Sequence, residues 1–156
     1  MIILKHILPL LLIIFLISGC ETDDDPIPEQ FEATFPIDEV EDSGISGDIT
    51  FFKTDNNTTL ITIKLNGTVA GDIHPVRIHS TSPDQDGPVV KRLNSINGAT
   101  GLSETLVTDL EDGTVTTYED WVSFNGYVLV LQSEENINVQ VALGLLGDNI
   151  PNIPGG

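Results

Sequence analysis

Hydrophobic and polar residues alternate with a period of two along most of the chain after residue 30. Ile61, Ile63 and Leu65 alternate with polar neighbours, and residues 137–143 alternate in the same way. This period is typical of strands with one side facing solvent. The run 127–131 is apolar on both faces, which predicts a central strand that is covered on both sides.

Turn-forming pairs of Asn, Asp and Gly separate further segments with strand character. These segments are 32–40, 47–54, 73–80, 89–93 and 103–109. No segment shows sustained helical periodicity, and residues 117–124 could form only a single helical turn. We therefore predict an all-β fold, a Greek-key β-sandwich or barrel of about seven or eight antiparallel strands.

The N-terminal segment has a different pattern. Lys5 precedes the apolar run 7–17, which is shorter than the roughly 20 residues that a membrane-spanning helix needs. Ser18 and Gly19 follow, and then Cys20, which is the only cysteine of the chain. A positive charge, an apolar run and small residues in this order predict a secretory signal peptide that is removed from the mature protein.

The sequence Ile-Ser-Gly-Cys at 17–20 resembles the bacterial lipobox. The resemblance implies a signal peptide at 1–19, cleavage before Cys20, a diacylglycerol on its sulfur and an acyl chain such as palmitate on its amino group. The alternative is an ordinary secreted protein with one stray cysteine, although a lone thiol is unusual in an oxidising compartment. Two or three acyl chains would anchor the protein stably to a membrane.

Residues 20–30 are acidic and contain prolines, which predicts a lipidated, flexible tether before a single domain at 31–148. Residues 149–156 are predicted to form a flexible tail. The acidic cluster after Cys20 also resembles the export signal of Bacteroidetes lipoproteins. It implies an outer-membrane protein that faces the cell exterior, with a plain spacer and a periplasmic location as the alternatives.

The chain carries 24 acidic residues against six Lys and Arg, a net charge of −18. Such a surface repels phosphate backbones and anionic headgroups, so we expect no nucleic-acid partner. Contact with the membrane is predicted only through the lipid on Cys20. A protein or carbohydrate partner is compatible with this charge, and the sequence does not identify it.

The run His-Pro-Val-Arg-Ile-His at 74–79 resembles the HPxHIH signature of the CHRD domain. The likeness extends in chain order over 31–148, through segments at 44–51, 86–90, 117–118, 124–130 and 141–144. The CHRD family is similar to the β-sandwich of copper/zinc superoxide dismutases. The resemblance thus implies a Greek-key all-β fold, and it raises the possibility of metal binding or redox chemistry.

The dismutase resemblance places copper ligands at Arg77 and His79, with His74 in the position of a structural histidine. Arg77 has no lone pair with which to bind a cation. Leu131 stands where relatives carry a further histidine. We therefore predict that the protein is not a superoxide dismutase and needs no cofactor. His74 and His79 are the only metal-ligand candidates, and they should face opposite sides of one strand.

Two interpretations of these histidines stay open. His79 could bind a metal together with Asp84 or Asp86. The alternative, which we favour, is that His74 is a half-buried histidine with its hydrogen bonds satisfied and that His79 faces solvent. No motif for nucleophilic or acid–base catalysis is present, so a catalytic role is not expected.

Tyr118 and Trp121 could form an exposed recognition patch or cap one end of the sandwich, and we favour the cap. Binding of a carbohydrate would require an exposed aromatic platform, such as Trp121. The sequence as a whole predicts a lipid-anchored surface module with a non-enzymatic role in binding, adhesion or structure. The competing hypothesis is a metal-binding or redox protein that uses His79 and His74.

Overall fold

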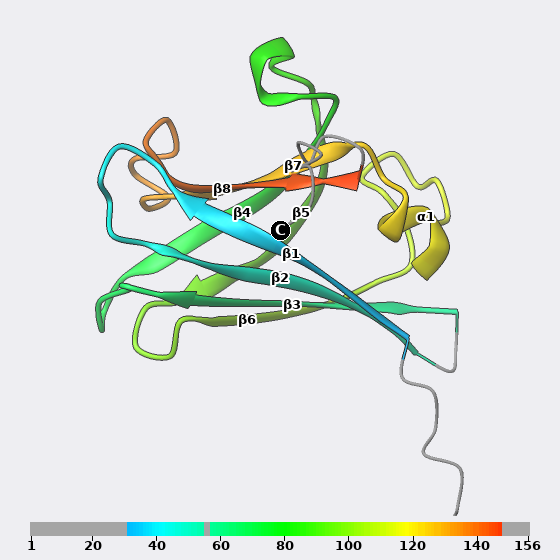
Figure 1. Ribbon diagram of the computed structural model, residues 1–156, viewed down its shortest axis with the longest axis horizontal. Helices are drawn as coiled ribbons and strands as arrows, with labels where there is room; N and C mark the ends of the chain where they lie inside the picture. Colours follow the sequence, from blue (N-terminus) through cyan, green and yellow to red (C-terminus); the bar gives the residue numbers. More distant parts are fainter. Residues whose placement is uncertain (1–30, 55–56, 148–156) are drawn as a thin grey trace, which may run out of the picture.

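The computed structural model describes residues 31–54 and 57–147, and it confirms the all-β prediction. Eight antiparallel strands form a closed barrel (Figure 1). The strands are β1 (Glu32–Glu39), β2 (Ser46–Lys53), β3 (Thr59–Asn66), β4 (Ile73–Ser80), β5 (Val89–Asn97), β6 (Leu102–Val107), β7 (Gly126–Leu131) and β8 (Gln140–Leu146). The predicted signal peptide, Cys20, the tether and the tail at 149–156 lie outside the described residues.

The strand order around the barrel is β1-β2-β3-β6-β5-β4-β7-β8. Strands β4, β5 and β6 pair in succession, and β7 returns to pair with β4, which is the spatial order of a Greek key. Strand β3 pairs with β6 and completes a second, overlapping key. Closure pairs every strand on both sides, which removes the free edges that promote aggregation.

The barrel consists of two four-stranded sheets joined by two short seams. Strands β5 and β6 pair only at Asn97 and Leu102, and β1 and β8 pair at two positions. Side chains help to close the β5–β6 seam, where the Asn94 amide donates to the carbonyl oxygen of Glu104 at 2.7 Å. The molecule is therefore both a sandwich of two sheets and a closed barrel.

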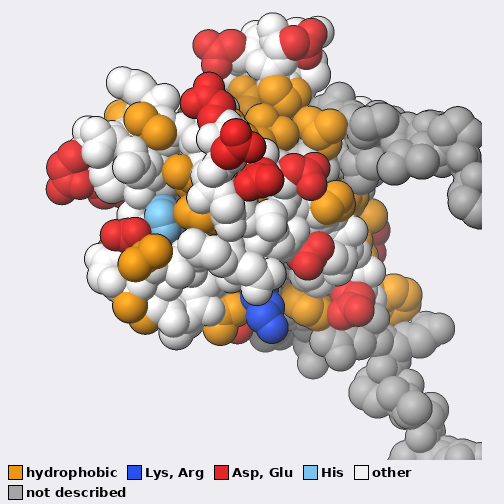
Figure 2. Space-filling model, turned by 60° about the vertical axis from the view of Figure 1, so that its left-hand side comes forward, with side chains coloured by type: hydrophobic (Ala, Val, Ile, Leu, Met, Phe, Trp, Pro, Cys, Tyr) orange, Lys and Arg blue, Asp and Glu red, His pale blue; other side chains and the backbone are white. Residues whose placement is uncertain are grey.

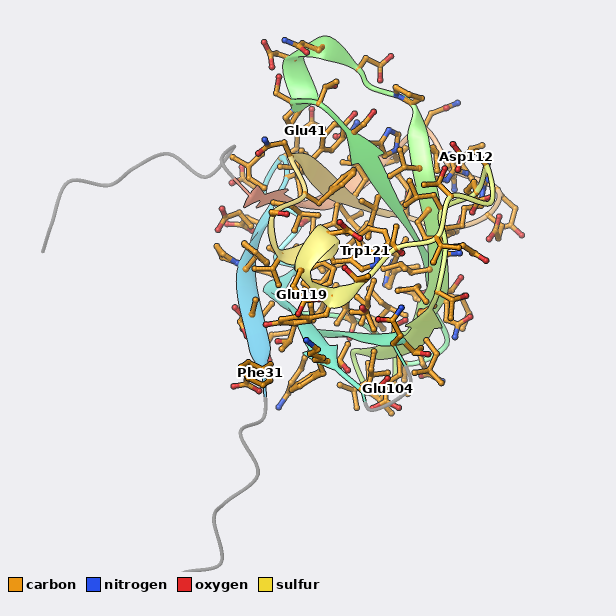
Figure 3. All side chains as sticks on the ribbon, turned by 90° about the vertical axis from the view of Figure 1, so that its right-hand side faces the viewer. Phe31, Glu41, Glu104, Asp112, Glu119 and Trp121 are labelled. Atoms are coloured by element: carbon orange, nitrogen blue, oxygen red, sulfur yellow. The ribbon has the colours of Figure 1, made fainter. Side chains whose placement is uncertain are left out.

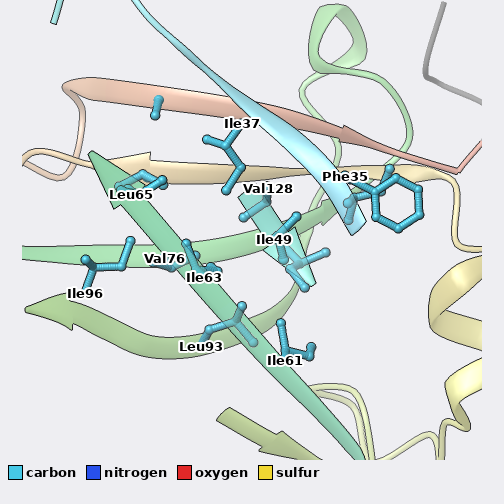
Figure 4. Close-up of a cluster of buried hydrophobic side chains, with 14 of the residues drawn as sticks. Phe35, Ile37, Ile49, Ile61, Ile63, Leu65, Val76, Leu93, Ile96 and Val128 are labelled. Atoms are coloured by element: carbon cyan, nitrogen blue, oxygen red, sulfur yellow. The ribbon is translucent and has the colours of Figure 1, made fainter. Parts of the chain in front are cut away.

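The alternating residues of the strands fill the space between the two sheets. Figure 4 shows buried side chains of both sheets packing against one another, among them Phe35, Ile49, Ile63, Val76 and Val128. Each fully buried aliphatic side chain stabilises the fold by roughly 1.5–3 kcal/mol relative to an exposed one.

The predicted central strand is confirmed, because all six residues of β7 are buried. Its side chains alternate between the two faces of the sheet. Val128 and Val130 join the interior, whereas Tyr127, Leu129 and Leu131 form a second apolar cluster. This second cluster includes the partly buried side chains of Leu143 and Leu145 from β8, the neighbouring strand.

The last strand differs from its prediction. The alternating run at 137–143 predicted a strand there, but β8 begins at Gln140, and Ile137 and Val139 are exposed in the preceding loop. The loop closes on itself, since the Gln132 N–H donates to the Val139 carbonyl at 2.9 Å. Strand β5 also runs beyond its predicted end at 93, because its later residues form the seam with β6.

A short helix, α1 (Tyr118–Val122), confirms the predicted single turn. Thr117 and Asp120 form a reciprocal capping box at its start. Trp121 is 1 % exposed and stacks on Phe51 with ring centroids 6.0 Å apart, and Tyr118 packs against the same core. Figure 3 shows Trp121 over the middle of the barrel end. The cap is thus confirmed, and the exposed patch and the sugar platform at Trp121 are wrong.

The strand directions define two ends of the barrel (Figure 1). The Phe31 end comprises Phe31, Thr54, residues 57–58, α1 and the loops 81–88 and 108–125. The His74 end comprises the loops 40–45, 67–72, 98–101 and 132–139. Within the described part of the chain, no helix is long and apolar enough to span a membrane.

Candidate binding site at the His74 end

His74 lies near the start of strand β4, and its side chain is on the inner side of the barrel at one end. Val76 and Ile78 on the same strand belong to the interior, and the pairing of β4 with β5 shifts register between His74 and Val76. Pro75 lies at this shift, where a residue without an N–H fits because it cannot complete a ladder. The irregular start of β4 thus leaves His74 at the mouth of the interior.

His74 lines a hollow of about 350 Å³ between three loops of the His74 end. The volume is in the range of small-ligand sites, which begins at roughly 300 Å³. Most of the lining is apolar, and two carboxylates border it. The lining includes the side chains of Val40, Ile45, Val69, Val139, Val141, Glu41, Asp72 and His74.

His74 is 3 % exposed, and its two ring nitrogens differ in their contacts. Its Nδ1 lies 3.3 Å from the carbonyl oxygen of Leu131, and a carbonyl can only accept, so Nδ1 carries the hydrogen. In the neutral ring Nε2 is then an acceptor. Nε2 is buried and has no partner among the described residues. The prediction of a half-buried, satisfied histidine is therefore wrong, because His74 is buried and one nitrogen is unpaired.

Acidic side chains surround the His74 end. Its four loops contain Glu41, Asp42, Asp72, Glu134 and Glu135, and no Lys or Arg. A second hollow, between the loops 71–73 and 132–135, shares Asp72 with the first. The potential at this end is negative, and it favours cationic ligands.

The basic residues with ion pairs among the described residues neutralise acids elsewhere. Lys53 pairs with Glu119, Lys91 with Asp109 at 2.8 Å, and Arg92 with Glu111 at 3.0 Å. The hydrogen bond from Lys91 lowers the pKa of Asp109 below its ordinary value. The Arg92 backbone N–H does the same for the pKa of Glu111.

Exposed apolar side chains concentrate around the same hollows. Eight large hydrophobic side chains of the described residues are exposed, and five of them lie in the loops of the His74 end or at the first residue of the strand that follows: Val69, Ile73, Leu102, Ile137 and Val139. Figure 2 turns this end toward the viewer and shows hydrophobic and acidic side chains next to one another. Clustered exposed apolar groups with a polar rim are typical of interaction sites.

His79 lies on the other side of β4, as predicted, and stacks on Tyr127 with ring centroids 4.8 Å apart. Its Nδ1 donates to the Gly87 carbonyl at 2.7 Å, and it is 9 % exposed. The prediction that His79 faces solvent is wrong, because the Tyr127 ring covers it. Burial, together with the nearby charge of Asp86, raises the pKa of Tyr127 above its ordinary value.

The structure does not bring the two histidines together. In the described ranges, no group of three or more His, Cys, Asp or Glu residues could hold a metal ion, so Asp84 and Asp86 do not complete a site with His79. This arrangement gives no support to the metal-binding hypothesis.

A hollow of about 370 Å³ lies at the Phe31 end. Thr116 and Trp121 line it, and the Thr116 hydroxyl and the Trp121 indole N–H are buried without a partner among the described residues. The aromatic rings beside it belong to the cap.

The sequence identified His74 but missed the loops around it. Val69 lies in a turn between two glycines, and the alternating pattern wrongly predicts a strand at the exposed Ile137 and Val139. An apolar residue in a turn, next to an acidic residue such as Asp72, is the signal that could have pointed to this end. Only the topology places the four loops together.

Comparisons with known proteins identify no related protein. No protein-family model matches the sequence, and no curated protein and no solved structure is significantly similar to it. The resemblance to CHRD domains stays a prediction.

Proposed function

We propose that the protein is a lipid-anchored cell-surface binding module without enzymatic activity, and that it binds its ligand at the His74 end. One relationship carries the proposal. Phe31, where the tether would join the barrel, and His74, which lines the hollow, lie at opposite ends of the same barrel.

The position of Phe31 decides how the domain would be displayed. An anchor on Cys20 would hold the Phe31 end toward the membrane, and the His74 end would point away from it. Eleven residues at 20–30 reach about 35 Å when extended. That length is sufficient to lift the barrel clear of the lipid headgroups, and the negative surface disfavours its return to an anionic membrane.

The chemistry of the His74 end supports binding better than catalysis. It combines apolar walls, two carboxylates and one unpaired acceptor, which are features of a recognition site. The proposed kinship with CHRD domains would make this chain a member that has lost copper ligands, since Arg77 occupies one ligand position. The metal-binding alternative is not favoured, because His74 and His79 face opposite sides of the sheet.

Thiol labelling of intact cells tests whether the domain is exposed on the cell surface. Lipidated Cys20 has no free thiol, so a cysteine introduced in place of the exposed Ala70 would be the only one that reacts with a membrane-impermeant maleimide. We expect Ala70→Cys to be labelled on intact cells. Ser103→Cys, which is buried at the same end, should stay unlabelled.

Cys20→Ser tests the anchor in the same cells. We expect this variant to leave the membrane fraction and to keep its signal peptide. Labelling of Ala70→Cys only after the outer membrane is opened would contradict surface display. Retention of Cys20→Ser in the membranes would contradict lipid anchoring.

A further inference from the structure

We infer that the ligand of the His74 end is a primary alkylammonium group, such as a lysine side chain presented by a basic partner protein. This inference rests on the proposed function and names the chemistry that the site selects. It is carried by the carboxylates and apolar walls of one hollow, which His74 also lines, and by the buried Nε2 of that histidine, which has no partner among the described residues.

The negative charge around the hollow favours a cationic ligand. Glu41 and Asp72 border the hollow, and Asp42, Glu134 and Glu135 lie in the same loops without a Lys or Arg. An anionic ligand would be repelled by these carboxylates. A cationic partner would be attracted before contact, which raises the association rate at low ionic strength.

The apolar side chains that line the hollow favour a ligand whose cationic group is attached to an alkyl chain. Val40, Ile45, Val139 and Val141 line the hollow, and Val69 is 63 % exposed at its rim. A hydrated metal ion or free ammonium would leave these surfaces in water. A chain of methylenes would cover them, with a gain of about 0.8 kcal/mol for each buried CH₂.

His74 requires a hydrogen-bond donor. Its Nδ1 is occupied by the carbonyl of Leu131, so Nε2 is the nitrogen left to accept from a ligand N–H or O–H. Because Nε2 is buried, the ligand would reach it by displacing the side chains that cover it. An ammonium group has three donors, enough for His74 and the two carboxylates at once. An alcohol has one donor and no charge. A divalent cation would need more ligands than the described residues around the hollow provide.

Titration with small probes tests the inference. Residues 20–156 with Cys20→Ser contain every strand of the closed barrel, and this protein would be titrated with n-pentylamine, n-pentanol and pentanoate at pH 7. Pentylamine is protonated at this pH, as a lysine side chain is. We expect only pentylammonium to shift the amide NMR signals of loops 40–45, 67–72 and 132–139, and the shifts should weaken with added salt.

Two results would overturn the inference: equal shifts with pentanol, which would show a purely apolar site, or shifts confined to the Phe31 end. His74→Phe keeps a flat ring without the acceptor, and it should weaken pentylammonium binding roughly tenfold, the cost of one charge-assisted hydrogen bond. Unchanged affinity of a folded His74→Phe would exclude the role of Nε2. These outcomes are independent of the cell-labelling results, so failure of the ligand assignment and failure of the display proposal are distinguishable.

Discussion

The Nδ1 of His74 lies 3.3 Å from the carbonyl oxygen of Leu131, and this contact ties the start of β4 to the end of β7. The ring is thereby held with Nε2 buried and with no partner in the ranges 31–54 and 57–147. A buried acceptor without a partner costs about 1–3 kcal/mol, so the fold retains an unfavourable group at the site that we propose to bind ligand.

Replacement of that ring should therefore cost little stability. In His74→Phe, loss of a long hydrogen bond is offset by removal of the unpaired nitrogen, and we expect the free energy of unfolding to change by less than about 1 kcal/mol. His79→Phe is the matched comparison, since its Nδ1 bond to Gly87 is shorter, at 2.7 Å. Urea unfolding should show a larger loss for His79→Phe, and the reverse order would contradict the different strengths of the two bonds.

The glycines of loop 67–72 give a second prediction. Both Gly67 and Gly71 have positive φ, but a Cβ at Gly67 would lie 1.9 Å from the Gly44 carbonyl oxygen, whereas Gly71 has open space. Gly71→Ala should cost about 1 kcal/mol for the backbone conformation alone. Gly67→Ala should cost at least about 2 kcal/mol more, because loop 40–45 must move. Thermal unfolding of the two variants measures the difference, and equal losses would argue against close contact of these loops.

A third prediction concerns the cap at the Phe31 end. Trp121 is buried against Phe51 and Phe124, so Trp121→Ala should lower the free energy of unfolding by about 3–5 kcal/mol. Tyr118→Ala, which alters a half-buried neighbour on the same helix, should cost clearly less. Unfolding followed by circular dichroism compares them, and an equally small loss in both would contradict the role of Trp121 in the core.

Low pH should open this same end first. Hydrogen bonds from Lys91, Thr114 and Thr117 lower the pKa values of Asp109, Asp112 and Asp120 below their ordinary range. Carboxylates with lowered pKa stabilise the folded state above their unfolded value, near 4, and lose that contribution as pH falls through the folded value.

The fluorescence of Trp121, the only tryptophan, reports on this region directly. We expect its emission to shift to longer wavelength below about pH 4, before strand structure is lost. Asp120→Asn should be a less effective cap and should move the change to higher pH. A simultaneous loss of strands and tryptophan burial would contradict local opening.

The barrel was predictable because its strands alternate strictly. Ile61, Ile63 and Leu65 are buried as the period-two pattern requires, and the apolar run of β7 is covered on both faces. The same rule failed at 137–139, where alternation continues into a loop that closes through its own hydrogen bonds. The alternation indicates which residues could form a strand. The position at which the strand begins depends on its pairing with neighbouring strands.

The candidate site was only partly predictable. His74 stood out as a residue type, but its burial depends on the register shift at Pro75 and on loops distant in sequence. Glu41 and Asp72 are ordinary turn residues until the Greek key places them beside the same hollow. The burial of His79 likewise depends on Tyr127, which only the pairing of β4 with β7 puts against it.

The most direct measurement compares pentylammonium affinity in two double variants that remove the same number of charges. Glu41→Gln/Asp72→Asn neutralises the hollow, and Asp84→Asn/Glu104→Gln neutralises two exposed acids that do not line it. We expect the first to raise the dissociation constant about tenfold, because each partly screened ion pair contributes up to roughly 1 kcal/mol. The second should leave it unchanged. Equal effects would show a response to net charge alone and would contradict a binding site at the His74 end.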